Sequence, residues 1–357
     1  MRILNVADFN WMTGAERNAA SVSLFDVCRK LSLAATRADH LVVEFSDRAV
    51  ARYGAPLRIK GLGAGWANRR FLQVVDEVKP DLIWLHFADL ITNASLREAR
   101  RLAPGVVVAD INIDPVDTPK NQRRLDMRRG VADALFVTTA EPGLARSAGP
   151  RAFAAYLPNP VDRAVESGRV FDIARPGFDL LLPVGDDRPR ELGDARLTPG
   201  DAAARLRSAV PGLRLSTPGL GGQPSARGFA YFEALQSARI GWSLSRRASQ
   251  PLYASDRMAH FFGWGLATAL DRRAGFERFY AKDEAIFYDD LADLAAVLNR
   301  LIVDDAEARA IARRGWAKTW SLFDSGRVLD YVLAQLFDDG GATGYAWPCE
   351  RWRGSDG

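Results

Sequence analysis

The sequence predicts an α/β protein made of two parallel-sheet domains, and three observations support this fold class. The chain has 357 residues, more than one typical domain of about 100 to 150 residues contains. Short apolar runs alternate with amphipathic stretches, the order typical of parallel strands joined by crossover helices. The Pro-rich segment Leu157-Pro158-Asn159-Pro160-Val161-Asp162 could be a plain turn, but it lies near mid-chain, where a hinge between two such series is needed.

The composition is that of a globular protein. Hydrophobic residues make up 48% of the chain and charged residues 26%, and the longest apolar runs are far shorter than a bilayer-spanning helix. Residues 1–7 indicate an opening strand rather than a signal peptide, because Asp8 follows a short apolar run. Only Cys28 and Cys349 occur beside three histidines. We therefore expect no disulfide framework, no bound metal or cofactor, and a reducing cytoplasm.

The charge balance is mildly basic. The formal net charge is +4, the pI is 9.2, and only six lysines occur, so arginine carries nearly all of the positive charge. Such a balance suits nucleic acid, an anionic membrane surface or a phosphate-bearing substrate. No basic cluster with interleaved aromatic residues stands out in the body of the chain, which disfavours nucleic acid. We expect a phosphate-bearing substrate and a peripheral contact with the anionic inner membrane.

The first domain is expected over residues 1–162 and has the strand count of one Rossmann-like domain. No G-x-G-x-x-G motif follows its first strand, which disfavours a dehydrogenase. Ser95 and Glu98 have the spacing of a capping box at the start of a helix. The strands are expected near residues 2–7, 40–45, 81–87, 106–112, 134–139 and 153–157, and the helices near 19–33, 66–78, 95–102 and 122–128.

The second domain is expected over residues 163–324. Asp290 and Asp304 are predicted to cap its last two amphipathic helices. A helix over residues 325–337 follows, and the glycine-rich residues 340–357 are expected to form a mobile tail anchored by Trp347 and Trp352. The domain's strands are expected near residues 180–184, 213–217, 238–245 and 266–270, and its other helices near 199–210, 229–237 and 256–262, with one more beginning near Phe276.

The stretch from Tyr253 to Tyr280 has the features of a phosphate site. Ser255 and Asp256 are helix N-cap residues, and Gly263 and Gly265 end the short helix that follows. A buried strand then leads into the turn Asp271-Arg272-Arg273-Ala274-Gly275. A helix N-terminus and a basic turn after a strand both offer N–H groups and cations that can hold a phosphate.

This stretch resembles the carboxyl-terminal domain of GT-B glycosyltransferases, most closely the group related to the spore-maturation protein CgeB. The similarity comprises a Tyr-x-Ser-x-Arg helix, the turn sequence DRRAGFE and a tail over residues 284–320. It implies two Rossmann-like domains facing a cleft, with a helix that crosses back to the first domain. It also implies transfer of a sugar from a nucleotide-sugar donor to a hydroxyl acceptor. The acceptor expected is a bacterial surface polysaccharide, glycolipid or other glycoconjugate, and no metal is required.

The resemblance also implies a donor pocket on the second domain. Arg257 occupies the Ser-x-Arg position and is expected to stabilise the leaving diphosphate. Many retaining GT-B enzymes carry two glutamates eight residues apart, but Leu252 and His260 stand at those positions, which leaves the ribose contact and the stereochemistry open. A buried core histidine is the alternative for His260. The donor-binding residues expected are Gly185, Arg188, Tyr253, Ser255, Arg257, His260, Arg272, Arg273 and Gly275.

Polar residues after the strands of the first domain are the acceptor-side candidates. An inverting transferase needs a general base, and Asp8, His86 and Asp114 are the expected catalytic residues. Their alternative is a structural role as turn or capping residues. Two other functions stay open: a non-catalytic sugar- or nucleotide-binding protein and a nucleotide-sugar epimerase. The remaining cleft residues expected are Asn10, Gly14, Thr138, Thr139 and Glu141.

Overall fold

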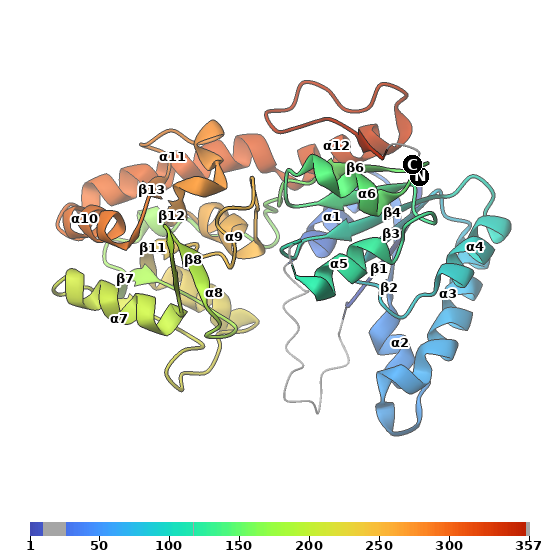
Figure 1. The fold of residues 1–357 in the computed structure, drawn as a ribbon, viewed down its shortest axis with the longest axis horizontal. Helices are drawn as coiled ribbons and strands as arrows, with labels where there is room; N and C mark the ends of the chain where they lie inside the picture. Colours follow the sequence, from blue (N-terminus) through green and yellow to red (C-terminus); the bar gives the residue numbers. More distant parts are fainter. Residues whose placement is uncertain (10–25, 117, 355–357) are drawn as a thin grey trace. The chain divides into compact units, whose positions relative to one another are not determined.

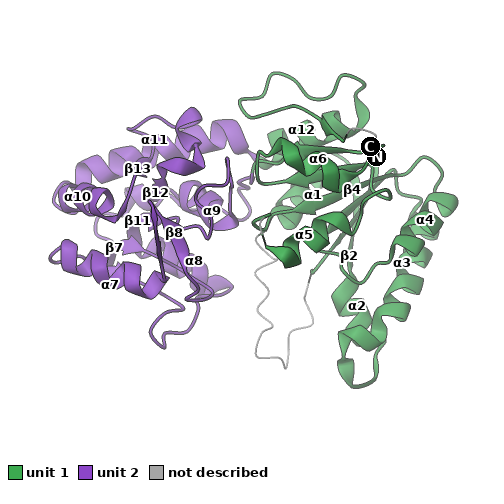
Figure 2. Cartoon of the chain, in the orientation of Figure 1, with its two compact units in different colours: residues 1–158, 325–357 green, residues 159–324 purple. Residues whose placement is uncertain are grey.

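The computed structural model describes all residues except 10–25, 117 and 355–357. It divides the chain into two compact units, shown in Figure 2. Unit 1 comprises residues 1–158 and 325–357, and unit 2 comprises residues 159–324. The chain therefore passes from unit 1 to unit 2 after residue 158, four residues before the boundary expected after residue 162. Residues 325–357 belong to unit 1.

Unit 1 contains a seven-stranded sheet in the order β14-β6-β5-β4-β3-β1-β2 (Figure 1). All neighbouring pairs are parallel except β14 with β6. The interior strand β3 is buried along its whole length, as expected for a parallel sheet covered on both faces. The strands are β1 (Arg2–Ala7), β2 (Leu41–Ser46), β3 (Leu82–His86), β4 (Val107–Asn112), β5 (Ala134–Val137), β6 (Phe153–Tyr156) and β14 (Trp352–Arg353).

The helices of unit 1 differ from the predicted ones mainly at their starts. Helix α4 begins after Thr92, whose hydroxyl accepts from the Ser95 amide at 3.1 Å, so the predicted cap at Ser95 is wrong by three residues. Helix α2 was not predicted, although Ser46 caps it. The start expected for the first helix falls largely outside the described residues. The helices are α1 (Val27–Arg37), α2 (Asp47–Tyr53), α3 (Ala64–Val78), α4 (Asn93–Leu102), α5 (Pro119–Asp126), α6 (Ala145–Ala148) and α12 (Ser325–Phe337).

The described part of the carboxyl-terminal tail, which the sequence predicted to be mobile, packs on unit 1. Strand β14 pairs antiparallel with β6, opposite Ala154 and Phe153. Trp347 is buried, and the Tyr331 hydroxyl donates to the Tyr156 carbonyl at 2.7 Å. Buried aromatic side chains and the pairing of β14 with β6 thus hold the described part of the tail on unit 1 despite its glycine content.

Unit 2 contains a parallel five-stranded sheet in the order β10-β7-β11-β12-β13. Leucine, isoleucine and valine side chains from the sheet and from α7, α10 and α11 form its largest core cluster. The strands are β7 (Phe178–Leu181), β10 (Leu215–Ser216), β11 (Ala238–Trp242), β12 (Ala267–Asp271) and β13 (Ile286–Tyr288). The helices are α7 (Pro199–Ala209), α8 (Phe229–Gln236), α9 (Asp256–Trp264), α10 (Leu291–Leu301) and α11 (Asp305–Phe323).

Several local features of unit 2 depart from the prediction. The helix expected near Phe276 is a single 3-10 turn, Phe276–Arg278. A hairpin of β8 (Arg190–Leu192) and β9 (Ala195–Leu197) follows β7 and was not predicted. Gly263 lies inside α9, and only Gly265, with a φ of 81°, ends that helix.

Candidate functional site

The carboxyl edge of the unit 2 sheet brings several predicted donor residues together. Strands β7 and β11 are hydrogen-bonded neighbours, with Leu180 opposite Ile240, so the segments that follow them leave the sheet at the same edge. The first continues through Pro183 to the loop before β8, and the second continues through Leu244. Helix α9 begins at this edge, capped by Ser255, whose hydroxyl accepts from the Met258 amide. Ser255 therefore positions the helix.

Arg257, in the first turn of α9, fixes its guanidinium between the two strand ends. Its Nη1 donates to the Pro183 carbonyl at 3.2 Å, and its Nη2 donates to the Leu244 carbonyl at 2.6 Å. Its Nε is buried and has no hydrogen-bond partner among the described residues. Burial lowers the pKa of Arg257, but an arginine so placed still carries its charge at neutral pH.

Arg190, at the start of β8, lies beside Arg257. Its Nη1 donates to the same Leu244 carbonyl at 3.1 Å, and its side chain is almost fully buried. Burial, and next the neighbouring Arg257, lower the pKa of Arg190 to about 10. Its Nε also lacks a partner among the described residues. Two like charges held close in a poorly solvated place favour the binding of an anion.

One carboxylate, Asp186, faces these arginines. It accepts from Arg246 Nη2 at 2.6 Å and from Arg188 Nη2 at 2.9 Å, and its Oδ1 lies 3.7 Å from Arg190 Nη2. Among the described residues, no other carboxylate forms an ion pair with Arg188, Arg190, Arg246 or Arg257. We call Arg188, Arg190, Arg246 and Arg257 the arginine cluster. Three of these guanidinium groups share one carboxylate and Arg257 donates to backbone carbonyls, which leaves a positive surplus that suits a diphosphate.

The other predicted donor residues are placed differently. Arg272 pairs with Glu277 and with Asp289, and Arg273 pairs with Asp271 at 2.7 Å. These two arginines therefore have carboxylate partners of their own. Gly275 has a φ of 77°, which a glycine allows between two short turns. Gly185 faces open space, since nothing lies within 4 Å of the position a Cβ would take. Tyr253 is buried and lies close enough to Arg257 and Arg190 to influence the pKa of both.

His260 is buried and makes a hydrogen bond inside unit 2. Its Nδ1 lies 2.6 Å from Glu166 Oε1, and the Tyr231 ring packs edge-on at 5.5 Å. The other carboxylate oxygen of Glu166 accepts from the Asp162 amide at 2.7 Å. This geometry favours the core histidine that the sequence left as the alternative to a ribose contact.

The acceptor-side candidates of unit 1 lie in a network of alternating charges. Arg48 pairs with Asp8 at 3.1 Å and with Asp89 at 3.2 Å. Arg124 pairs with Asp89 at 3.2 Å and with Asp114 at 3.3 Å. The network connects residues that follow β1, β3 and β4, so Asp8 and Asp114 meet at one edge of the sheet. Asn10 and Gly14 lie outside the described residues.

His86 is a poor candidate for a general base. It is buried at the end of β3, and its Nδ1 lies 2.5 Å from Cys28 Sγ. Burial, helped by the charges of Arg124 and Arg48, lowers the pKa of His86 to about 3. An imidazole with such a pKa does not accept a proton at neutral pH. Asp26, Cys28 and His86 place their ligand atoms within 4.8 Å of one another. This is a set of donor types that zinc accepts, so the absence of a metal stays a prediction.

Asp110, on β4, is a candidate that the sequence did not single out. Burial raises its pKa to about 7, and it lines a small pocket with Phe87, Asn112 and Arg124. A carboxyl group with a pKa near neutrality beside a pocket has the properties of a general base. The sequence feature that could have pointed to Asp110 is an aspartate within a mostly apolar strand. Thr138 and Thr139 are fully buried, whereas Glu141 is half-buried.

Replacing Asp110 by asparagine is expected to change the pH dependence of stability. The folded protein holds this proton up to about pH 7, whereas an unfolded aspartate loses it near pH 4. Below pH 4, Asp110 therefore makes its full stabilising contribution to the free energy of unfolding of the wild type. This contribution is lost as the pH rises to 7. We expect the free energy of unfolding of Asp110→Asn, relative to wild type, to increase over that window in urea titrations. Parallel curves for the two proteins would contradict the assignment.

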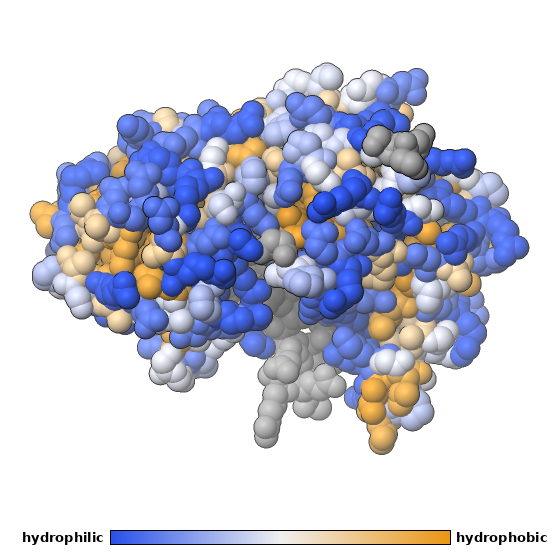
Figure 3. Space-filling model, in the orientation of Figure 1, coloured by the Kyte–Doolittle hydropathy of each residue, from blue (hydrophilic) through white to orange (hydrophobic). Residues whose placement is uncertain are grey.

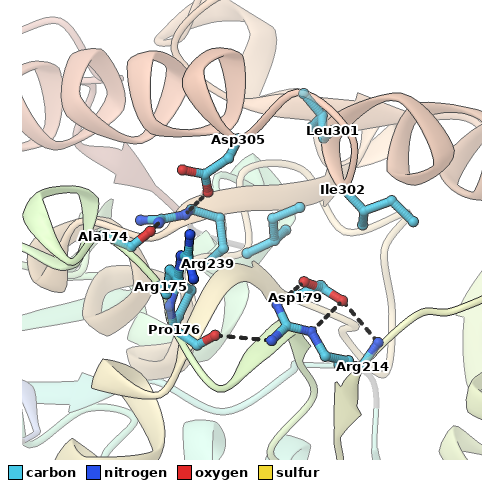
Figure 4. A pocket seen from close by; sticks show the side chains of 10 residues that line it. Ala174, Arg175, Pro176, Asp179, Arg214, Arg239, Leu301, Ile302 and Asp305 are labelled. Atoms are coloured by element: carbon cyan, nitrogen blue, oxygen red, sulfur yellow. Dashed lines mark hydrogen bonds and ion pairs between the residues drawn. The ribbon is translucent and has the colours of Figure 1, made fainter.

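A pocket of about 310 Å³ lies at the opposite edge of the unit 2 sheet (Figure 4). Two of its three arginines have carboxylate partners within the pocket lining: Arg239 pairs with Asp305 at 2.7 Å and Arg214 with Asp179 at 2.5 Å. Arg239 also donates to the Val170 carbonyl at 3.0 Å. Paired charges at the amino ends of the strands indicate a structural role.

The comparisons with known proteins agree with this architecture. Residues 201–334 match a family model described as glycosyl transferase-like, and no curated protein matches the chain in sequence. HepE from Anabaena, solved with UDP and glucose, is similar with a TM-score of 0.55 at 13% identity, over 93% of this chain and 98% of HepE. Sucrose-phosphate synthase from Thermosynechococcus elongatus has a TM-score of 0.60 at 13% identity, over 93% and 97% of the two chains. AviGT4, a glycosyltransferase involved in avilamycin A biosynthesis, has a TM-score of 0.56 at 15% identity, over 94% and 96%.

Two parallel-sheet units and these similarities define the class: the chain has the GT-B fold. The family match adds the second step: residues 201–334, most of unit 2 and of α12, match the glycosyl transferase-like model. The stretch from Tyr253 to Tyr280 lies inside that range, so the predicted resemblance is confirmed.

Proposed function

We propose that this protein is a glycosyltransferase that moves a sugar from a nucleotide-sugar donor to a hydroxyl acceptor, and that the arginine cluster binds the donor's diphosphate. The observation that carries the proposal is the shared Leu244 carbonyl, which holds Arg190 and Arg257 side by side at 3.1 and 2.6 Å. Both Nε groups are buried and lack partners among the described residues. A bound diphosphate would supply the missing acceptors.

The cluster would act on the leaving group. Negative charge develops on the diphosphate as its bond to the sugar breaks, and fixed cations stabilise that charge without reorganising. Arg257 is fixed by two backbone carbonyls. The guanidinium groups supply the positive charge that a metal ion supplies elsewhere, so we propose a metal-independent reaction.

We propose that unit 1 provides the acceptor side. If the transfer inverts the anomeric centre, Asp110 is the carboxyl group whose pKa best suits proton abstraction at neutral pH. Asp8 and Asp114 are held by arginines and would orient the acceptor. The family resemblance supports a bacterial surface polysaccharide or other glycoconjugate as the acceptor, reached from the cytoplasm.

The proposal is tested by thermal stabilisation with UDP-, GDP-, dTDP-, ADP- and CMP-sugars. UDP-glucose is the first donor to try, because HepE has been solved with it. A ligand present at about 100 times its Kd and bound only by the folded state should stabilise by roughly 2.7 kcal/mol. Release of the nucleoside diphosphate is then followed with and without added glycan acceptors.

The outcomes separate the alternatives. Diphosphate release that requires an acceptor supports transfer. Conversion of the donor sugar without an acceptor would instead identify an epimerase, and binding without any turnover would identify a non-catalytic binding protein. If none of the nucleotide sugars stabilises the protein, the arginine cluster is not the donor site.

A further inference from the structure

An exposed hydrophobic surface lies on unit 1 between α2 and α3, over residues 52–70, which we call the tip. Figure 3 shows hydrophobic residues gathered at the free end of this segment. Five of the large hydrophobic side chains that the described residues expose belong to it. They are Tyr53, Leu57, Ile59, Leu62 and Trp66, which are 75%, 89%, 50%, 65% and 37% exposed. Such side chains are normally scattered singly over a protein surface.

The backbone of the tip is closely packed at its base. Two 3-10 turns, Pro56–Arg58 and Lys60–Gly63, connect the two helices. A Cβ on Gly63 would lie 1.8 Å from the Ala51 carbonyl oxygen, and one on Gly54 would lie 2.2 Å from the Trp66 ring. The chain segments therefore contact one another through glycines, and the larger apolar side chains point outward.

All the charged residues of the tip are basic. No aspartate or glutamate occurs from residue 48 to residue 75. The basic residues are spaced between the apolar ones, which is why the sequence did not present them as a cluster. Arg69 lies over the Trp66 ring at 5.5 Å. The basic residues of the tip are Arg52, Arg58, Lys60, Arg69 and Arg70.

We infer that the tip is a docking surface for membranes that contain anionic lipids. Its leucine, isoleucine and aromatic side chains would enter the interface between headgroups and acyl chains, and its arginines and lysine would contact lipid phosphates. None of the described helices has the length and apolarity needed to cross a bilayer, so the contact is peripheral. A second copy of the tip is disfavoured as the occupant, because like charges would face each other.

Vesicle co-sedimentation of the full chain tests this inference. We expect binding to vesicles of phosphatidylcholine with about one-third phosphatidylglycerol, weaker binding to pure phosphatidylcholine, and loss at high salt. The double variant Leu57→Ser/Leu62→Ser and the charge variant Arg58→Glu/Lys60→Glu should each weaken binding by about tenfold or more. Matched controls in unit 2 are Val303→Ser, at an 85% exposed position, and Arg205→Glu on α7; both should bind like wild type.

Because the altered side chains are exposed, all four variants should melt like wild type. Failure of the wild-type chain to bind the anionic vesicles, or equal binding by the tip variants, would overturn the inference. A concentration-dependent dimer that the tip variants disperse, without vesicle binding, would assign the surface to a second copy. The measurement needs no donor or acceptor, so its result is independent of the proposed sugar transfer.

Discussion

Replacing Arg257 by alanine is expected to lower kcat/KM for the donor by about 100- to 1000-fold. The substitution removes a guanidinium that two backbone carbonyls fix beside Arg190. The loss should appear mainly in kcat, because the positive charge is needed most when the diphosphate departs. Initial rates with the donor found by thermal stabilisation give both constants, and the melting temperature shows whether unit 2 still folds.

Two companion variants make this result interpretable. Arg257→Lys keeps a positive charge but cannot reach both carbonyls with a planar group, so it should recover only part of the rate. Arg205→Ala removes an exposed arginine of α7 and should leave kcat/KM unchanged. If Arg257→Ala melts like wild type and turns over at the wild-type rate, the arginine cluster does not contact the leaving group.

Replacing Glu166 by alanine is expected to destabilise unit 2 by about 3–5 kcal/mol, the usual cost of removing one partner of a buried pair. The carboxylate lies 2.6 Å from His260 Nδ1 and 2.7 Å from the Asp162 amide. The substitution leaves both groups buried without this acceptor and opens a cavity beside Gly263, whose Cα faces the Glu166 side chain. Urea unfolding followed by tryptophan fluorescence measures the change.

The control for this prediction is Glu233→Ala, because Glu233 is exposed on α8; it should stay within about 0.5 kcal/mol of wild type. The double variant Glu166→Leu/His260→Leu should be more stable than Glu166→Ala, since the apolar pair fills the cavity and removes the imidazole that has lost its partner; both variants lose the acceptor of the Asp162 amide. A Glu166→Ala protein as stable as wild type, with altered nucleotide binding, would return His260 to the donor pocket.

Much of the fold could be predicted from the sequence, because parallel strands and their helices have distinct hydrophobic periods. The strand at β3 is four apolar or aromatic residues followed by a histidine, and β12 follows a helix that a glycine terminates. Short elements were missed where tertiary pairing defines them. Strand β13 and the β8–β9 hairpin have only three residues per strand, too few for a periodic signal.

The site could be predicted only in part. Arg257 was proposed from its place in a motif, whereas only the fold brings Arg190 to the Leu244 carbonyl and Arg246 to Asp186. Conversely, Arg272 and Arg273 look available in the sequence until the fold gives them acidic partners. Asp110 has its raised pKa because of burial, and burial depends on the whole sheet.

The division of the chain has a consequence for how the protein is made. Unit 2 is inserted in unit 1, and its two ends are adjacent, since the Val161 amide donates to the Phe323 carbonyl at 2.8 Å. A ribosome delivers every residue of unit 2 before it delivers α12 and β14, which complete unit 1. Unit 2 can therefore finish folding first, while the edge of β6 that β14 will later cover is still open to other strands.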